Sequence, residues 1–177
     1  MVNETAGLFR YADFEYFQKN GKNLLYSICE DHTIDEPSRV VNTLVCFPVS
    51  DGGNNSPISS TPQSHHILVN ASRDPELMFS SPRVDPSGRY IAWIEWRHPN
   101  MPWDDTFLFV AQLSEDGTHL ISEPVCVAGG TGESVMEPVW QRDSSGYAWH
   151  AYQCLHTIIA NKLLNNIITL SLIFVIQ

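Results

Sequence analysis

The chain has 177 residues, a formal net charge of −10 and a hydrophobic fraction of 43%. This length fits one domain of ordinary size and excludes a large two-domain enzyme. Acidic residues outnumber basic ones 20 to 10, so no basic surface can dominate, which argues against a nucleic-acid partner. The apolar content suffices for a buried core and argues against general disorder.

The four cysteines are Cys29, Cys46, Cys126 and Cys154, and no two of them form a Cys-x-x-Cys pair. This spacing fits neither a zinc site nor a dense disulfide framework. We expect buried free thiols in a reducing compartment, and residues 1–17 carry no secretory signal pattern. The sequence therefore predicts a cytoplasmic location.

Short runs rich in β-branched and aromatic residues follow one another over most of the chain. Each run is bounded by Gly, Pro, Asn, Asp or Ser, which is typical of strands joined by turns. In chain order, the predicted strands are Leu24–Glu30, Val41–Phe47, Ile67–Asn70, Tyr90–Trp96, Thr106–Leu113, Val125–Ala128 and Pro138–Gln141. Many short strands with frequent turns indicate an antiparallel, all-β architecture.

The predicted turns carry residues that favour a reversal of the chain. Asp85–Gly88 has Asp and Pro at the first two positions of a type I turn. It ends on a glycine, which adopts positive φ without steric strain. Gln18–Gly21 fits the same scheme more weakly. Further turns of this kind are predicted at Ser114–Gly117 and Arg142–Gly146.

Aligning the turns at Gly21 and Gly88 indicates an internal repeat. In both units a strand follows the glycine, and a polar loop with His and Pro follows the strand. The segment that starts at Glu137 echoes the one that starts at Ser81 and begins a third unit. Four-stranded antiparallel units repeated along a chain are typical of a β-propeller. We therefore predict a partial β-propeller of about two and a half antiparallel blades over residues 1–147.

The meander within each blade predicts which connections share one end of the molecule. Loops between the second and third strands of a blade lie at the same end as the connections between blades. Four segments are therefore expected to cluster, namely Asp31–Arg39, Arg73–Ser80, Arg97–Asp105 and Gly129–Ser134. This end is the expected place for a partner or a second domain.

The stretch Ser80–Trp93, with the sequence SSPRVDPSGRYIAW, resembles the propeller of prolyl oligopeptidase family serine peptidases. The nearest group is that of the dipeptidyl aminopeptidases and acylaminoacyl-peptidases, and His98–Asp104 is similar to a distinctive motif of this group. Supporting similarities lie at Arg10–Phe14, Glu30–Thr33 and Val127–Gly130. The resemblance implies a parent protein in which the propeller precedes an α/β-hydrolase domain with a Ser-Asp-His triad and limits access to the active site.

A nucleophile motif of that kind is not found in this chain. The nearest approach to Gly-x-Ser-x-Gly is Gly132–Met136, in which Met136 replaces the second glycine. Adjacent residues of a strand point to opposite faces, so His65 and His66 do not readily share a metal ion. We expect no catalytic residue, no cofactor site and no metal site, and we expect that this chain by itself is not an enzyme.

The best candidate for a functional surface is the loop that follows the predicted strand Tyr90–Trp96. It combines aromatic, sulfur-containing and polar side chains, a mixture suited to an interface. Its candidate domain-interface residues are Trp96, Arg97, His98, Asn100, Met101, Trp103 and Asp104. The alternative is that Met101 and Trp103 only pack this loop onto its own blade.

The chain changes character after Tyr147. Residues 148–177 include a long, almost uncharged apolar run, which the polar residues of Asn161–Asn166 interrupt. Only Ile167–Ile176 is uninterrupted, well short of the roughly 20 residues that span a bilayer. We predict that residues 148–177 form a tail without a blade strand that is foreign to the propeller. We do not expect membrane association, although a tail-anchored protein is a remaining alternative.

The sequence therefore predicts a propeller fragment of a prolyl oligopeptidase-like serine peptidase. The resemblance implies that the parent hydrolyses peptides and that its propeller gates substrate access. The expected partner is the catalytic hydrolase domain of the parent, and peptides are candidate ligands. The alternative function is a non-catalytic, propeller-type protein-interaction module.

Overall fold

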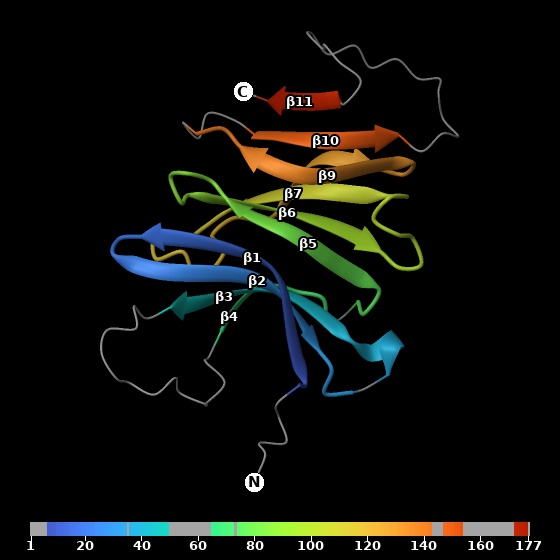
Figure 1. Ribbon diagram of the computed structural model, residues 1–177, viewed down its shortest axis with the longest axis horizontal. Coiled ribbons are helices and arrows are strands. Elements are labelled where there is room, and N and C mark those ends of the chain that lie inside the picture. Colours follow the sequence, from blue (N-terminus) through green and yellow to red (C-terminus); the bar gives the residue numbers. More distant parts are fainter. Residues whose placement is uncertain are drawn as a thin grey trace.

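A computed structural model of the protein describes residues 7–34, 36–49, 65–72, 74–142, 147–153 and 172–176. The strands form two antiparallel sheets, one with the order β1-β2-β3-β4 and one that runs from β5 to β11 (Figure 1). The second sheet divides further, because β8 and β9 share only the pair Gly130 and Glu133. The architecture is therefore a row of blades, each built as a meander.

The first blade consists of β1 (Phe9–Lys19), β2 (Lys22–Asp31), β3 (Val41–Val49) and β4 (His66–Asn70), with a short 3-10 helix, η1, at Pro37–Arg39. Asn20 and Gly21 alone join β1 to β2, and both have positive φ, at 50° and 72°. Positive φ at both positions is the requirement of the primed turn whose twist matches a hairpin. This turn therefore differs from the type I turn that the sequence predicts there.

The middle blade consists of β5 (Leu77–Val84), β6 (Tyr90–Arg97), β7 (Thr106–Gln112) and β8 (Val125–Gly130). Its first turn has the predicted type I hydrogen bond, because the Gly88 N–H donates to the Asp85 carbonyl at 2.8 Å. The buried Asp85 carboxylate accepts further bonds from the backbone N–H groups of Ser87, Arg89 and Tyr90. The Asp85 side chain thus stabilises the turn by hydrogen bonds to its backbone, as Asp at the first turn position commonly does.

The third blade contains β9 (Glu133–Trp140), β10 (Tyr147–Gln153) and β11 (Leu172–Ile176). β10 pairs with β9, and β11 pairs with β10. The prediction of a partial propeller with two complete blades and part of another is confirmed. The expectation that no blade strand follows Tyr147 was wrong, because apolar runs of this kind pair readily with a free sheet edge. The boundary at residue 147 and the foreign origin of the tail stay predictions.

The sequence patterns above predict neither β1 nor β5, and a shared irregularity explains the omission. The first strand of each blade has a bulge that contains one non-glycine residue with positive φ: Asp13 at 53°, Ser81 at 53° and Glu137 at 52°. A bulge inserts an extra residue and breaks the alternation that identifies a strand. Pro82 and Pro138 follow two of these residues, and proline is tolerated in a sheet at such places.

The core lies between the blades, in two clusters. The first joins Leu24, Tyr26 and Leu44 of the first blade to Ile91 and Trp93 of the middle blade. The second joins Ala92, Ile94 and Leu108 of the middle blade to Val135 of the third blade. Because successive residues of β6 point to opposite faces, this strand is apolar on both sides and its centre is buried on both.

The structure contains the repeat that the turns indicate, but the sequence alignment of the two units matches residues that lie on opposite faces of their blades. It matches Leu24 with Ile91, yet Leu24 faces the next blade along the chain, whereas Ile91 faces the preceding one. The two hairpin turns differ in length by an odd number of residues, since Asn20 and Gly21 form one and residues 85–89 form the other. A shift of one residue transfers a strand's side chains to the other face.

Candidate domain-interface loop

The connections β4–β5, β6–β7 and β8–β9 come together at one end of the blades, on the right of Figure 1. The His98 N–H donates to the Glu76 carbonyl at 2.8 Å, which joins the first two connections. The Gly132 N–H donates to Asp105 Oδ1 at 2.5 Å, which joins the second to the third. The clustering that the meander predicts is therefore present for these three segments.

The β6–β7 loop is also held by bonds within itself. The Asn100 N–H donates to the Arg97 carbonyl at 3.0 Å, and the Asp104 N–H donates to the Met101 carbonyl at 2.9 Å. The Asp104 carboxylate accepts from the Met101 N–H at 2.9 Å, and Asn100 Nδ2 donates to Asp105 Oδ2 at 2.7 Å. These four bonds connect both halves of the loop to one another.

Two of the predicted interface residues hold the loop in place. The Arg97 guanidinium pairs with the carboxylate of Asp74 and, at 3.8 Å, with that of Glu76. The hydrogen bond and charge of Asp74 raise the pKa of Arg97 above its ordinary value. Trp96 is half-buried and packs against the cluster between the middle and third blades. The sequence pattern contains no sign of the ion pair, because Asp74 belongs to another connection.

Two other predicted residues project outward. The Trp103 side chain is 62% exposed and that of Met101 is 38% exposed, although both are large and apolar. Ile34, in the β2–β3 connection, is a third exposed apolar residue in the loops between strands of the blades. A rigid loop that presents tryptophan to solvent is the arrangement found at interaction surfaces, where Trp contributes strongly to binding.

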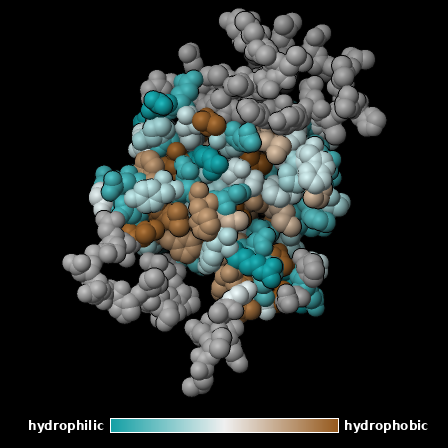
Figure 2. Space-filling model, in the orientation of Figure 1, coloured by the Kyte–Doolittle hydropathy of each residue, from teal (hydrophilic) through white to brown (hydrophobic). Residues whose placement is uncertain are grey.

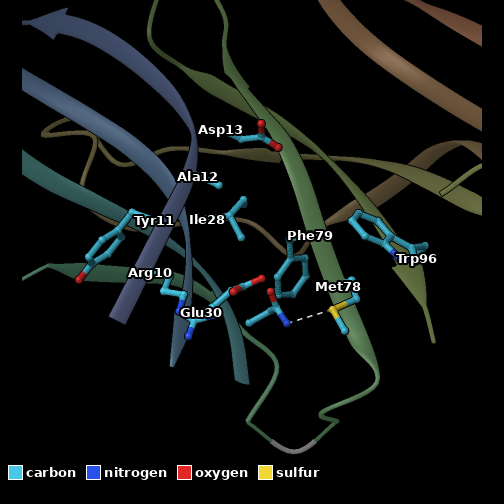
Figure 3. Close-up of a pocket in the computed structure, with 10 residues that line it drawn as sticks. Arg10, Tyr11, Ala12, Asp13, Ile28, Glu30, Met78, Phe79 and Trp96 are labelled. Atoms are coloured by element: carbon cyan, nitrogen blue, oxygen red, sulfur yellow. Dashed lines mark hydrogen bonds between the residues drawn. The ribbon is translucent and has the colours of Figure 1, made fainter. Parts of the chain in front are cut away.

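A small cavity of about 170 Å³ lies between the first and middle blades (Figure 3). It has charged groups on Arg10, Asp13 and Glu30, and apolar walls that include Phe79 and Trp96. Its lining includes the carboxylates of Asp13 and Glu30 and the hydroxyl of Tyr11, and no serine, threonine, cysteine, histidine or lysine. The cavity therefore combines charged and polar groups with apolar walls.

Ser134 and His65, which the sequence analysis considered as a possible nucleophile and a possible metal ligand, make other contacts in the structure. Ser134 is buried, and its hydroxyl donates to the Pro102 carbonyl at 2.6 Å. The His65 ring lies among the aromatic rings of Phe9, Tyr11 and Phe47. Within the described residues there is no group of three or more His, Cys, Asp or Glu side chains that could hold a metal ion. In the same part of the chain, no helix has the length and apolar character to cross a membrane.

Solved structures with the same fold are puromycin hydrolases, which are peptidases of the prolyl oligopeptidase family. A mutant puromycin hydrolase complexed with PGG is 26% identical, with a TM-score of 0.62 over 81% of this chain and 20% of that chain. A puromycin-hydrolyzing peptidase from Mycobacterium tuberculosis is 25% identical, with a TM-score of 0.56 over 81% of this chain and 19% of that one.

The chain thus spans about a fifth of the length of these neighbours. No protein-family model matches the sequence, and a search of curated proteins finds no match. The resemblance indicated by Ser80–Trp93 and His98–Asp104 is nevertheless confirmed by the structural likeness. In sequence and in fold, the chain resembles a fragment of the propeller of prolyl oligopeptidase family peptidases.

Proposed function

We propose that this chain is a non-catalytic propeller segment of a prolyl oligopeptidase-like serine peptidase. The observation that carries the proposal is the likeness to puromycin hydrolase, at 26% identity over 81% of this chain. The parent hydrolyses peptides by acyl transfer through a serine outside this segment, and its propeller limits access to that serine. Puromycin, which the neighbours' names include, is a candidate substrate of the parent.

The β4–β5, β6–β7 and β8–β9 connections meet at one end of the blades, which we call the loop end. This end is the proposed docking surface for the catalytic domain. The Glu76 carbonyl, the Gly132 N–H and the Ser134 hydroxyl already hold the β6–β7 loop by hydrogen bonds, so docking does not have to order it. Preorganisation of this kind reduces the entropic cost of association. Met101 and Trp103 then supply the apolar contact.

A cytoplasmic location is part of the same proposal. Cys29 and Cys46 are buried free thiols, as expected in a reducing compartment, whereas the free thiol of Cys126 is exposed, contrary to the expectation. Burial raises the pKa of Cys46 to about 12, which keeps this thiol protonated and unreactive at neutral pH.

The parent assignment is tested by reading the genomic sequence on both sides of this coding segment. We expect further blade repeats in frame and a Gly-x-Ser-x-Gly motif followed by Asp and His. In the protein encoded by that longer frame, Trp103→Ala should loosen the contact with the hydrolase domain, detected as faster hydrogen exchange at the loop end. Ile121→Ala, an exposed apolar residue on the middle blade, is the matched control. A gene without any hydrolase motif in frame would refute the parent assignment.

The non-catalytic character is tested on the 177-residue chain itself. We expect no hydrolysis of puromycin and no labelling by a fluorophosphonate probe. The physical reason is that Ser134 is buried and its hydroxyl donates to the Pro102 carbonyl rather than to a base that could activate it. Stoichiometric labelling that disappears in Ser134→Ala would contradict the proposal.

A further inference from the structure

The cavity between the first and middle blades has a polar wall and an apolar wall. Arg10, Glu30 and Asn42 pair directly across β1, β2 and β3, so their side chains form a row on one face of the first blade. The opposite wall comes from β5 and β6 of the middle blade and consists of Met78, Phe79 and Trp96 (Figure 3). Both walls lie within this chain, so further blades of a parent would leave the cavity in place. Seen from outside, apolar and polar side chains also alternate over this part of the molecule (Figure 2).

Asn42 is the most buried polar residue in the lining of this cavity, with an exposed fraction of 3%. Its Nδ2 donates to the Met78 sulfur at 3.0 Å, and a thioether has no hydrogen to donate in return, so the Asn42 oxygen is the atom left over. Among the residues that the structure describes, Asn42 Oδ1 has no hydrogen-bond donor. A buried acceptor without a donor costs free energy, so this atom favours a ligand that brings one.

Two carboxylates in the same cavity provide further acceptors. Glu30 Oε2 bonds to the His32 ring at 3.0 Å, and Glu30 Oε1 has no partner in the described part of the chain. Asp13 Oδ2 accepts from the Ser81 N–H at 3.1 Å, and the same holds for its Oδ1. Three side chains therefore have an acceptor atom to spare, and two of these side chains are anionic. A positively charged donor suits this set, because hydrogen bonds between ionised groups are stronger than neutral ones.

The apolar wall limits the rest of the ligand. Ile28 and Phe79 are each 4% exposed, and neither they nor Met78 have a side-chain N–H or O–H group. A ligand that fills this cavity of about 170 Å³ therefore needs one polar end and an apolar chain. An ammonium next to a carbonyl would press a second polar group against the apolar wall, which costs free energy. An alkylammonium, the group that ends a lysine side chain, avoids this cost.

We propose that this cavity binds an alkylammonium group, carried by a lysine side chain or by a free alkylamine. The ammonium donates to Glu30 and Asn42, and its methylene chain packs on Ile28 and Phe79. Arg10 lines the same cavity and carries the charge of the ligand, so it opposes binding. This inference goes beyond the proposed function, because the site needs neither a hydrolase domain nor a further blade.

The binding experiment titrates the isotope-labelled chain of 177 residues with n-butylamine at neutral pH and constant ionic strength. We expect a saturable shift of the NMR signal of the Asn42 side-chain amide, with a Kd of about 1 mM, as suits a ligand of so few atoms. The uncharged n-butanol should bind at least about tenfold more weakly. Nα-acetyl-lysine amide gives the same shift if the natural source is a lysine side chain, and none if it is a free alkylamine.

Two variants with opposite expected effects test the charge of the ligand. Glu30→Gln keeps the shape of the side chain but removes an anionic acceptor, so n-butylamine should bind about fivefold to tenfold more weakly. Arg10→Gln removes a like charge and should tighten binding about twofold. Glu36→Gln and Arg39→Gln are the matched controls and should leave the Kd unchanged, because these exposed residues pair with each other at 4.0 Å outside the cavity.

Circular dichroism verifies that the variants keep the native fold. The Glu30 side chain is 45% exposed, and the exposed Arg10→Gln variant keeps the test decisive if Glu30→Gln unfolds. Each of three results would overturn the proposal: no saturable shift in the native chain, equal binding of n-butanol, or a Kd that Glu30→Gln leaves unchanged or Arg10→Gln raises.

Discussion

The first and middle blades have the same strand order and the same bulge, but their first strands lie in different surroundings. β5 is covered by the first blade, and Phe79 and Val84 are buried in that contact. β1 has no such cover among the described residues, and Tyr11 and Tyr16 remain exposed. The difference teaches that burial in a repeat protein depends on the neighbouring repeat as well as on the position within the blade.

The largest expected effect is a stability difference between equivalent positions. Phe79→Ala should lower the free energy of unfolding by about 3–5 kcal/mol, because it leaves a cavity between two blades. Tyr11→Ala should cost less than half as much, because its side chain is already partly hydrated. Urea unfolding of both variants, measured at one protein concentration, checks the comparison. Equal losses at the two positions would contradict the difference in burial between Tyr11 and Phe79.

A second contrast lies between two aspartates in turns of the middle blade. Asp85→Ala should cost about 3 kcal/mol, because three part-buried backbone N–H groups lose their acceptor, the buried Asp85 carboxylate. The more exposed Asp116 accepts hydrogen bonds from Ser114 and Thr118, which lower its pKa, and Asp116→Ala should cost only about 1 kcal/mol. Urea midpoints of the two variants measure the difference, and a smaller loss for Asp85→Ala would contradict the assignment.

A third comparison concerns two tyrosine hydroxyls of the first blade. Tyr26 donates to the Gly117 carbonyl of the middle blade at 2.9 Å in a buried site. Tyr26→Phe should therefore cost about 1–2 kcal/mol, because the carbonyl loses its buried donor. The Tyr16 hydroxyl donates to Asn23 Oδ1 at 2.7 Å, and the Tyr16 side chain is exposed, so a water molecule can replace the lost hydroxyl. Tyr16→Phe should therefore cost only a few tenths of the free energy lost in Tyr26→Phe. Thermal unfolding of both variants decides the order.

The smallest expected effect is a pH dependence from Glu95. Burial raises its pKa above the ordinary 4.5, opposed by a hydrogen bond from the Trp93 indole and by the charge of Arg97. The folded carboxyl therefore holds its proton more tightly than the unfolded one. Stability contributed by this group falls as the pH rises from about 4.5 through the raised pKa.

Glu95→Gln should flatten the stability profile over that window and slightly raise stability at pH 7. Its amide oxygen can still accept from Trp93, so the hydrogen bond is retained. Glu123→Gln, at an exposed position of the same blade, is the control. The measurement is urea unfolding at closely spaced pH values, and a profile unchanged from that of the native chain would rule out Glu95 as its source.

For the candidate site, the sequence pattern selected the segment but did not assign a role to each residue in it. Trp96 and Arg97 end β6, and His98, Asn100, Met101, Trp103 and Asp104 follow in the β6–β7 loop. Their roles depend on partners from other connections, such as Asp74 for Arg97 and Glu76 for the His98 backbone. Such partners are distant in sequence, so composition alone could not separate anchors from the exposed Met101 and Trp103.

Local chemistry in the sequence determined most of the strands, the positions of the turns and the number of repeats. β-branched and aromatic runs favour extended backbone, and glycines such as Gly21 and Gly88 accept positive φ, so neither needs the rest of the fold. The tertiary structure alone decided which face of each strand is buried. Bulges at Asp13, Ser81 and Glu137 and unequal turn lengths change the phase of the alternation, and a strand has only two faces. A single inserted residue therefore reverses an assignment that the sequence pattern leaves ambiguous, and only packing against the neighbouring blade resolves it.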